Sequence, residues 1–387
     1  MTDPSRGWAD RPAELDPALA MLRRARWAAH ALAGYSASAL AAACDAASAA
    51  AADAAEQLAL DVAAATGAGS VPDLTLIHLA CAAGPEQLDV VRPLRDGAQL
   101  ISRPLGVVLL TTGGDHPVAG VYLAVIGALA SRNAVLLLVP PGPAERAAEL
   151  LSAAADAAGA PGGCVQWLVG ASPAVAAALA ADPDVDLCLD LPAAPPAAVP
   201  VLIDASADVA TAASSIIASV AFDHGLLPDA EDVLLVDSAV ADALLDALRA
   251  EGVQVLDAEQ AARLRALIGA SDHAGGRLPR GDSVGLAAAA RIEVPEGTRA
   301  LLLKLDHVLP EEPLLQPLPL PVLRWFPVNG ARQSLQAAQA VLAAGAGGSA
   351  AWAATAGGRR RCPGRGRTAA VHAADRATVL RLAQGLD

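Results

Sequence analysis

The chain has 387 residues, of which 54% are hydrophobic but only 2% aromatic, and its formal net charge at pH 7 is -14. The length predicts two or three domains of ordinary size, and the alanine-rich, aliphatic composition predicts a large core with much helix. The acidic balance argues against non-specific nucleic-acid binding, because that binding needs a basic surface that displaces counterions. One basic cluster, residues 359–367, is short and glycine-rich, and we expect a solvated loop there.

The cysteines are scattered along the chain and form no CxxC pair; they are Cys44, Cys81, Cys164, Cys188 and Cys362. Their odd number and spacing argue against a disulfide framework and against a structural zinc site. Free thiols favour a reducing, cytoplasmic location.

The N-terminus has no apolar run behind a basic start, so we expect no secretory signal. The most apolar run, 118–130, is too short to span a bilayer.

Residues 13–66 have helical periodicity, which ends at Gly67 and Gly69 before a further helix at 73–82. From Gly106 onward, short apolar strands alternate with helices. We expect strands at 107–110, 134–139, 164–169 and 185–189, with helices at 117–131, 144–158 and 172–181 between them. This alternation is typical of βαβ units around a parallel sheet, and the apolar strands indicate burial on both faces.

The alternation stops at a low-complexity run of Ala and Pro, residues 192–200, and then begins again. We expect strands at 201–204, 233–236, 253–256, 301–305 and 323–328, and helices at 207–221, 238–251, 258–269 and 331–344. The sequence therefore predicts an α/β protein with two halves, divided near Asp204 into residues 1–205 and 206–387.

Several segments, in order and almost collinear between about residues 15 and 345, resemble the CoA-acylating branch of the aldehyde dehydrogenase superfamily. They are 65–80 (ATGAGSVPDLTLIHLA), 103–110 (RPLGVVLL), 116–137 (HPVAGVYLAVIGALASRNAVLL), 183–189 (PDVDLCL), 201–225 (VLIDASADVATAASSIIASVAFDHG), 233–237 (VLLVD), 291–302 (RIEVPEGTRALL) and 310–323 (PEEPLLQPLPLPVL). The resemblance implies two Rossmann-like, three-layer domains with parallel sheets, the first cofactor-binding-like and the second catalytic-like. It also implies oxidation of an aldehyde by NAD (or NADP) and CoA, through a thioester on a cysteine.

The nucleophile is the first departure from this family. The cysteine of the family follows an FDNG-like run, and here the segment reads Phe222-Asp223-His224-Gly225 and continues to Pro228, which stands where the cysteine belongs. Proline has neither a nucleophile nor an N–H. No Cys, Ser or Thr lies between Phe222 and Asp237, so a shift of one residue does not restore the thiol.

Two further positions carry a family role by resemblance. His116 stands before Pro117 in place of the asparagine that stabilises the oxyanion; it either neighbours a helix start or donates a hydrogen bond to the substrate. Glu312 matches the glutamate that reaches the nicotinamide ribose, and a solvated Glu in a proline-rich loop is the equal alternative. No motif for a metal site is present.

The cofactor loop is the other main departure. The family has glycine-rich stretches before the VLID-like strand, where only glycine lets the backbone approach phosphates closely. Residues 191–200 contain no glycine. The tail also diverges: residues 364–372 resemble a glycine-rich GHT-like turn and strand with Arg367 in place of the histidine, and we expect a truncated or divergent C-terminal end that leaves the family's oligomer in doubt.

Cys362, between Arg361 and Pro363, has the arginine-rich setting that lowers a thiol pKa, but it matches no family nucleophile.

Three functional hypotheses remain open: a degenerate aldehyde dehydrogenase, an active NAD- and CoA-dependent oxidoreductase with a rearranged site, and a binding module or partner of an active paralogue, as a homo- or hetero-oligomer. We expect the first, with doubtful cofactor binding, an aldehyde as the substrate if activity survives, and no nucleic-acid or membrane partner.

Overall fold

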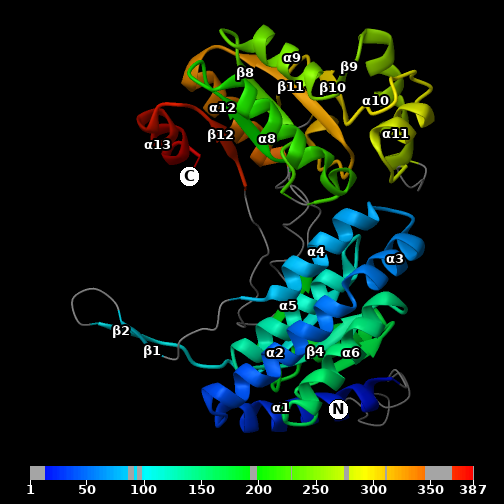
Figure 1. Cartoon of the computed structure of the whole chain (residues 1–387), viewed down its shortest axis with the longest axis vertical. Coiled ribbons are helices and arrows are strands. Elements are labelled where there is room, and N and C mark those ends of the chain that lie inside the picture. Colours follow the sequence, from blue (N-terminus) through cyan, green and yellow to red (C-terminus); the bar gives the residue numbers. More distant parts are fainter. Residues whose placement is uncertain are drawn as a thin grey trace, which may run out of the picture. The chain divides into compact units, whose positions relative to one another are not determined.

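The computed structural model describes residues 14–85, 91–93, 98–191, 198–227, 229–273, 279–309, 312–344 and 368–386. The chain forms two compact units, which are coloured along the sequence in Figure 1. Of the described residues, those up to 191 belong to the first unit, except for Gly67–Ser70, which belong to the second unit with everything from 198 onward. No helix in these ranges has the length and apolar character that a bilayer span requires.

The first unit begins with the helices α1 (Leu15–Ala33), α2 (Ala37–Asp53), α3 (Ala55–Thr66) and α4 (Val71–Ala83). Of these, α1, α2 and α3 lie in the region 13–66 that the sequence predicted as helical, and α4 is the further helix expected at 73–82. The region breaks after α1 because the chain turns at Gly34, and Ser36 starts α2 by accepting a hydrogen bond from the Ala39 N–H at 3.1 Å. A short antiparallel pair, β1 (Val91–Pro93) and β2 (Gln99–Ile101), follows; the sequence did not predict it.

A parallel sheet forms the core of the first unit. Its strands are β3 (Val107–Thr112), β4 (Ala134–Val139), β5 (Val165–Val169) and β6 (Leu187–Leu191), in the order β5-β4-β3-β6. The connecting helices are α5 (Pro117–Ala130), α6 (Pro143–Ala157) and α7 (Pro173–Ala181). Every residue of β4 is buried, as expected for a strand covered on both faces.

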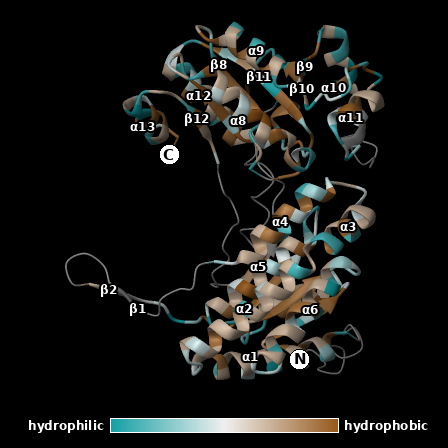
Figure 2. Ribbon diagram, in the orientation of Figure 1, coloured by the Kyte–Doolittle hydropathy of each residue, from teal (hydrophilic) through white to brown (hydrophobic). Residues whose placement is uncertain are grey.

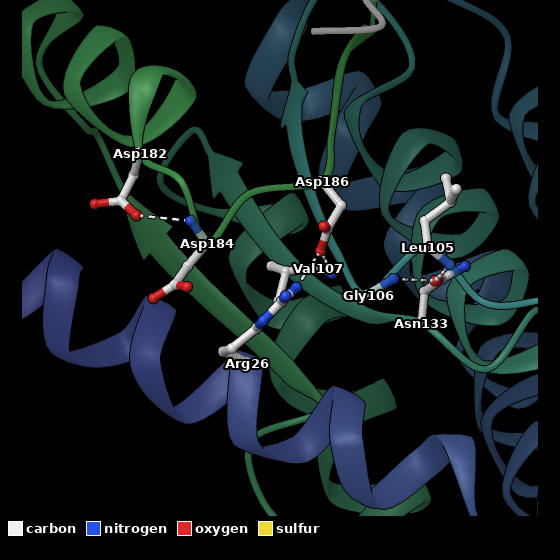
Figure 3. A network of polar contacts seen from close by, with 8 residues as sticks. All are labelled: Arg26, Leu105, Gly106, Val107, Asn133, Asp182, Asp184 and Asp186. Atoms are coloured by element: carbon white, nitrogen blue, oxygen red, sulfur yellow. Dashed lines mark hydrogen bonds and ion pairs between the residues drawn. The ribbon is translucent and has the colours of Figure 1, made fainter.

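A charged pair fixes the start of β3 beneath α1 (Figure 3). Arg26 of α1 pairs with Asp186, and the same Asp186 carboxylate accepts the Val107 N–H at 2.8 Å. Gly106 lies against this pair with φ +130°, where an added Cβ would be 2.7 Å from the Arg26 guanidinium. A side chain at position 106 is therefore excluded by both the backbone conformation and its neighbours.

Asn133, which directly precedes β4, also holds the backbone at the start of β3 (Figure 3). Its side-chain oxygen accepts the Leu105 N–H at 2.7 Å and the Gly106 N–H at 2.9 Å, and its amide donates to Ser131 Oγ at 2.8 Å. Because Asn133 is buried, it satisfies two backbone donors that water cannot reach easily.

The second unit is built on an all-parallel sheet of the order β12-β7-β8-β11-β10-β9. The strands are β7 (Pro200–Ile203), β8 (Val233–Asp237), β9 (Val253–Val255), β10 (Ala300–Lys304), β11 (Val322–Val328) and β12 (Ala370–His372). The helices are α8 (Val209–Ala221), α9 (Ala241–Ala250), α10 (Ala258–His273), α11 (Ser283–Ala289), α12 (Gly330–Ala344) and α13 (Arg376–Gln384). Two apolar clusters cover its two faces, and the strands carry mostly hydrophobic colours in Figure 2.

The predicted fold class, α/β with parallel sheets in two halves, is confirmed. The division between the halves, expected after residue 205, lies between Ala193 and Ala194 in the structure. The reason is β7: because its residues pair with β8 and β12, residues 200–203 belong to the second sheet.

Candidate functional site

A left-handed turn occupies the segment that resembles the approach to a catalytic cysteine. Phe222–Gly225 form a short 3-10 turn after α8, in which Asp223, His224 and Gly225 have φ values of 47°, 57° and 75°. Non-glycine residues rarely adopt this conformation, and such strain is concentrated at functional sites. No sequence pattern predicted this strain, although Asp, His and Gly are residue types that tolerate it.

Two contacts hold this turn in place. The Asp223 side chain is fully buried and its Oδ1 accepts the Ser70 N–H at 2.8 Å. A Cβ at Gly225 would lie 2.5 Å from the Leu320 carbonyl oxygen, so only glycine fits. The loop before α4 and the segment before β11 therefore clamp the turn from two directions.

Pro228, which the resemblance places at the position of the family nucleophile, lies outside the described residues. The residues after it are anchored to the C-terminal part of the chain: Asp229 Oδ1 accepts the Thr368 hydroxyl at 2.8 Å, and Glu231 Oε2 lies 3.7 Å from His372 Nε2. Of the segment 364–372, the structure describes 368–372, and its last three residues form β12 beside β7. This stretch therefore contains carboxylates and hydroxyls, but no thiol.

A buried ion pair, which the sequence did not predict, lies directly after these residues. Asp232 and Arg324 form a salt bridge, and the Arg324 side chain is fully buried. Asp232 Oδ1 also accepts the Val199 N–H at 2.9 Å, and Arg324 Nη1 donates to the carbonyls of Leu314 at 2.6 Å and Gln316 at 2.9 Å. Desolvation raises the pKa of Asp232 to about 6 against the opposing effect of Arg324. The pair ties together four separate segments of the second unit.

Glu312 has a well-defined set of partners in the structure. It begins a short 3-10 turn, Pro313–Leu315, and its side chain is only 11% exposed. One oxygen lies 2.9 Å from His307 Nε2, and the other lies 3.9 Å from an Arg265 nitrogen and accepts the Leu314 N–H at 3.3 Å. Because these groups already engage both oxygens, a ribose hydroxyl would have to compete with them.

His116 lies in the first unit, at the carboxyl end of β3. It precedes α5 with φ -122° and ψ 55°, and its side chain makes no capping hydrogen bond to that helix. The imidazole is half-buried. The position is the one that the sequence predicted, in the turn that follows Gly113 and Gly114, and its role as an oxyanion donor remains a prediction.

The thiols of the described residues all belong to the first unit, at Cys44, Cys81, Cys164 and Cys188. Burial raises the pKa of Cys44 to about 11, that of Cys81 above its usual value and that of Cys164 to about 12, with Asp45 and Asp156 adding to the shift for Cys44 and Cys164. A neutral, buried thiol is a poor nucleophile. Cys362 lies outside the described residues.

One side of the expected ligand crevice departs from what the resemblance implies for a dinucleotide or CoA phosphate. In an open α/β sheet the ligand crevice lies where the strand order reverses, here between the carboxyl ends of β3 and β6. After β3, the first four residues of α5 are buried, and Pro117 has no N–H to offer. After β6, only residues 192–199 separate Leu191 from β7, and none is a glycine. On the β6 side the connection therefore offers no glycine to a phosphate, whereas on the β3 side Gly113 and Gly114 lie in the turn before α5, and Gly114 is exposed.

Comparison with known proteins agrees with the resemblance read from the sequence. The family model "Aldehyde dehydrogenase family" matches residues 23–189. The acetylating acetaldehyde dehydrogenase EutE of Escherichia coli K12 is 30% identical over 292 residues, which cover 67% of this chain and 62% of that protein. The acylating sulfoacetaldehyde dehydrogenase of Cupriavidus necator is 31% identical over 190 residues, 44% of this chain and 38% of that protein. The chain thus matches less than two thirds of the length of these curated relatives.

Solved structures show the same fold. An acetylating aldehyde dehydrogenase from Geobacillus thermoglucosidasius superposes with a TM-score of 0.82 at 23% identity, covering 99% of this chain and 85% of that one. A propionaldehyde dehydrogenase from a Clostridium phytofermentans microcompartment gives 0.78 at 20% identity, with coverages of 95% and 85%. The family model and the curated relatives, together with this shared fold, show that the chain belongs to the aldehyde dehydrogenase superfamily, among relatives of its CoA-acylating branch.

Proposed function

We propose that this chain is a non-catalytic aldehyde dehydrogenase-like protein, which keeps the fold of the acylating enzymes and has lost aldehyde oxidation. One observation carries the proposal: the clamped turn Phe222–Gly225 is present, but no thiol follows it. The segment up to Asp237 has no Cys, Ser or Thr. The reaction of the family needs a thiolate to attack the aldehyde and to hold the acyl group until CoA removes it.

The connection after β6, which contains no glycine, supports the same proposal independently. With a shortened connection after β6 and buried first residues in α5, binding of NAD or NADP and of CoA would have to use groups other than those of the relatives. The role that such a chain retains is binding, either of a small molecule or of an active paralogue in a shared oligomer. We place it in the cytoplasm, because the chain has free cysteines and no disulfide in its described part.

The test is NADH formation, followed by absorbance, with purified chain, NAD, CoA and short aldehydes. We expect no CoA-dependent rate from a protein whose circular dichroism and cooperative unfolding show that it is folded. The acetylating enzyme of Geobacillus thermoglucosidasius is the positive control. A CoA-dependent rate that is lost in Cys362→Ala would overturn the proposal and identify Cys362 as the nucleophile; a rate that survives this substitution would overturn it as well.

The Pro228→Cys variant separates the loss of the nucleophile from the loss of the cofactor site. If both the nucleophile and the cofactor cradle are missing, restoring the thiol alone leaves NADH formation at background. NADH formation by this variant would show that the cofactor binds productively, and would contradict our assessment of the crevice between β3 and β6.

A further inference from the structure

A basic and aromatic surface on α1 stands out against the acidity of the chain. Trp27 lies four positions after Arg23 and three after Arg24 on this helix, so the indole shares the exposed helix face with both arginines. Trp27 is 65% exposed, the largest exposure among the exposed large hydrophobic residues of the described chain. In a protein of net charge -14, two neighbouring arginines and an indole in solvent form a local feature that core packing does not explain.

The two arginines differ from their neighbour in how they are used. Arg26 turns toward the sheet and pairs with Asp186 (Figure 3). Arg23 and Arg24 have no ion pair or side-chain hydrogen bond with any residue that the structure describes. Their guanidinium donors are therefore available to an anion, and the planar fork of arginine suits the oxygens of a phosphate.

Part of this surface is a hollow between α1 and the loop before β5. A hollow of about 600 Å³ is lined by Ala20, Arg23, Arg24, Trp27 and Gly162. The glycine comes from the loop before β5, and the next residue, Gly163, packs against the Arg24 backbone, where an added Cβ would be 3.7 Å from the Arg24 carbonyl oxygen. Gln166 fastens the loop to α1 by donating to the Met21 carbonyl at 3.3 Å. The hollow is thus bounded by two elements in contact, and it is widely open to solvent.

We propose that this hollow is a binding site for a small phosphorylated ligand that carries a flat ring, such as a nucleoside diphosphate. Arg23 and Arg24 bind the phosphate oxygens, and the ring stacks on the exposed face of Trp27, as bases stack on aromatic side chains in single-strand binding proteins. Ala20 has only a methyl side chain and Gly162 has none, which leaves room beside the indole. The site lies on α1, away from the crevice between β3 and β6, and the inference does not depend on the loss of aldehyde oxidation.

The experiment is isothermal titration of the full chain with ADP, and separately with pyrophosphate and with adenosine. We expect ADP to bind, pyrophosphate to bind roughly tenfold more weakly because stacking is lost, and adenosine to bind too weakly to measure. The affinity for ADP should fall as salt is added, because the arginines supply charge.

Three variants test whether ADP binds in this hollow. In Arg23→Gln/Arg24→Gln the affinity for both ADP and pyrophosphate should fall by at least about tenfold. Trp27→Ala should weaken ADP to the level of pyrophosphate and leave pyrophosphate unchanged. Arg332→Gln, an exposed arginine of α12 that has no partner among the described residues, removes a like charge elsewhere and should change nothing. ADP binding that is absent in the unaltered chain, or that is equal in all four proteins, would overturn the proposal.

Discussion

Asp232 and Arg324 form an ion pair in which the arginine side chain is fully buried and donates to two backbone carbonyls besides the carboxylate. Removing one partner of a buried pair leaves the other charge without compensation, which typically costs about 3–5 kcal/mol. Arg324→Met should therefore lower the free energy of unfolding by about that amount, measured by urea titration. Arg332→Met, at an exposed arginine of α12, is the matched control and should stay close to the unaltered protein.

The same variant should respond to pH in a defined direction. Burial already raises the pKa of Asp232 from its ordinary value of 3.8 to about 6, and without Arg324 the opposing effect disappears, so the pKa in the folded variant rises further. A raised pKa means that the folded state binds the proton more tightly than the unfolded state, so this contribution to stability is present at low pH and lost as pH rises through the folded value. The deficit of Arg324→Met should be largest near pH 7 and shrink toward pH 5; a deficit that grows on acidification would contradict the assignment of the buried charge.

Gly225→Ala tests the clamped turn. The substitution places a Cβ 2.5 Å from the Leu320 carbonyl at φ +75°, so we expect a loss well above the roughly 1 kcal/mol of an ordinary left-handed glycine. Gly297 has φ +83°, and no atom lies within 4 Å of an added Cβ. Gly297→Ala therefore measures the cost of a positive φ for alanine without a steric clash. Thermal unfolding of the two variants compares them, and equal losses would show that contact with Leu320 is unimportant.

Asn133→Ala removes the acceptor of the Leu105 and Gly106 N–H groups. Two donors at the start of β3 then lose their partner, which should cost roughly 1–3 kcal/mol for each one that stays buried. Asn329→Ala, at an exposed side chain after β11, serves as the control. Urea denaturation measures both, and amide hydrogen exchange at Leu105 and Gly106 should accelerate in the first variant only.

Thiol labelling follows from the pKa values. Because burial raises the pKa of Cys44 to about 11 and of Cys164 to about 12, both are almost entirely protonated at pH 8 and should react slowly with iodoacetamide. Cys362, flanked by arginine in the sequence, should react fastest. Peptide mass spectrometry after a short pulse gives the order, and labelling in urea should make the rates similar. Fast labelling of Cys164 in the folded chain would show that its strand opens.

Much of the fold could be predicted because its strands are continuous aliphatic runs bounded by Gly and Pro. Residues 134–139 form β4 as expected, and Pro117 and Pro143 are the first residues of α5 and α6. The pair β1 and β2 was missed because strands of three residues carry too little periodicity to recognise. In the same way, α13 was not expected, since its stretch lies beyond the collinear resemblance.

The site could be predicted only in part, for a different reason. The sequence shows directly that no Cys, Ser or Thr lies between Phe222 and Asp237, and the placement of Pro228 at the cysteine position stays a prediction from the resemblance. The burial of Asp232 with Arg324 and the contact of Asp223 with Ser70 join residues that are 92 and 153 positions apart, and no local pattern encodes such pairs. Likewise, Glu312 could be aligned to a ribose-binding glutamate, but its contacts with His307 and Arg265 depend on where β10 ends.

The four residues Gly67–Ser70 have a consequence for how the chain can be divided. They belong to the second unit although the helices on either side belong to the first, and the Ser70 N–H holds Asp223. A cut between Ala193 and Ala194 thus yields a C-terminal fragment without the donor that supports its own turn. A split-protein reporter cut at this position would carry Ser70 on its N-terminal fragment and Asp223 on its C-terminal fragment, so the turn would regain its donor only when the two fragments reassociate.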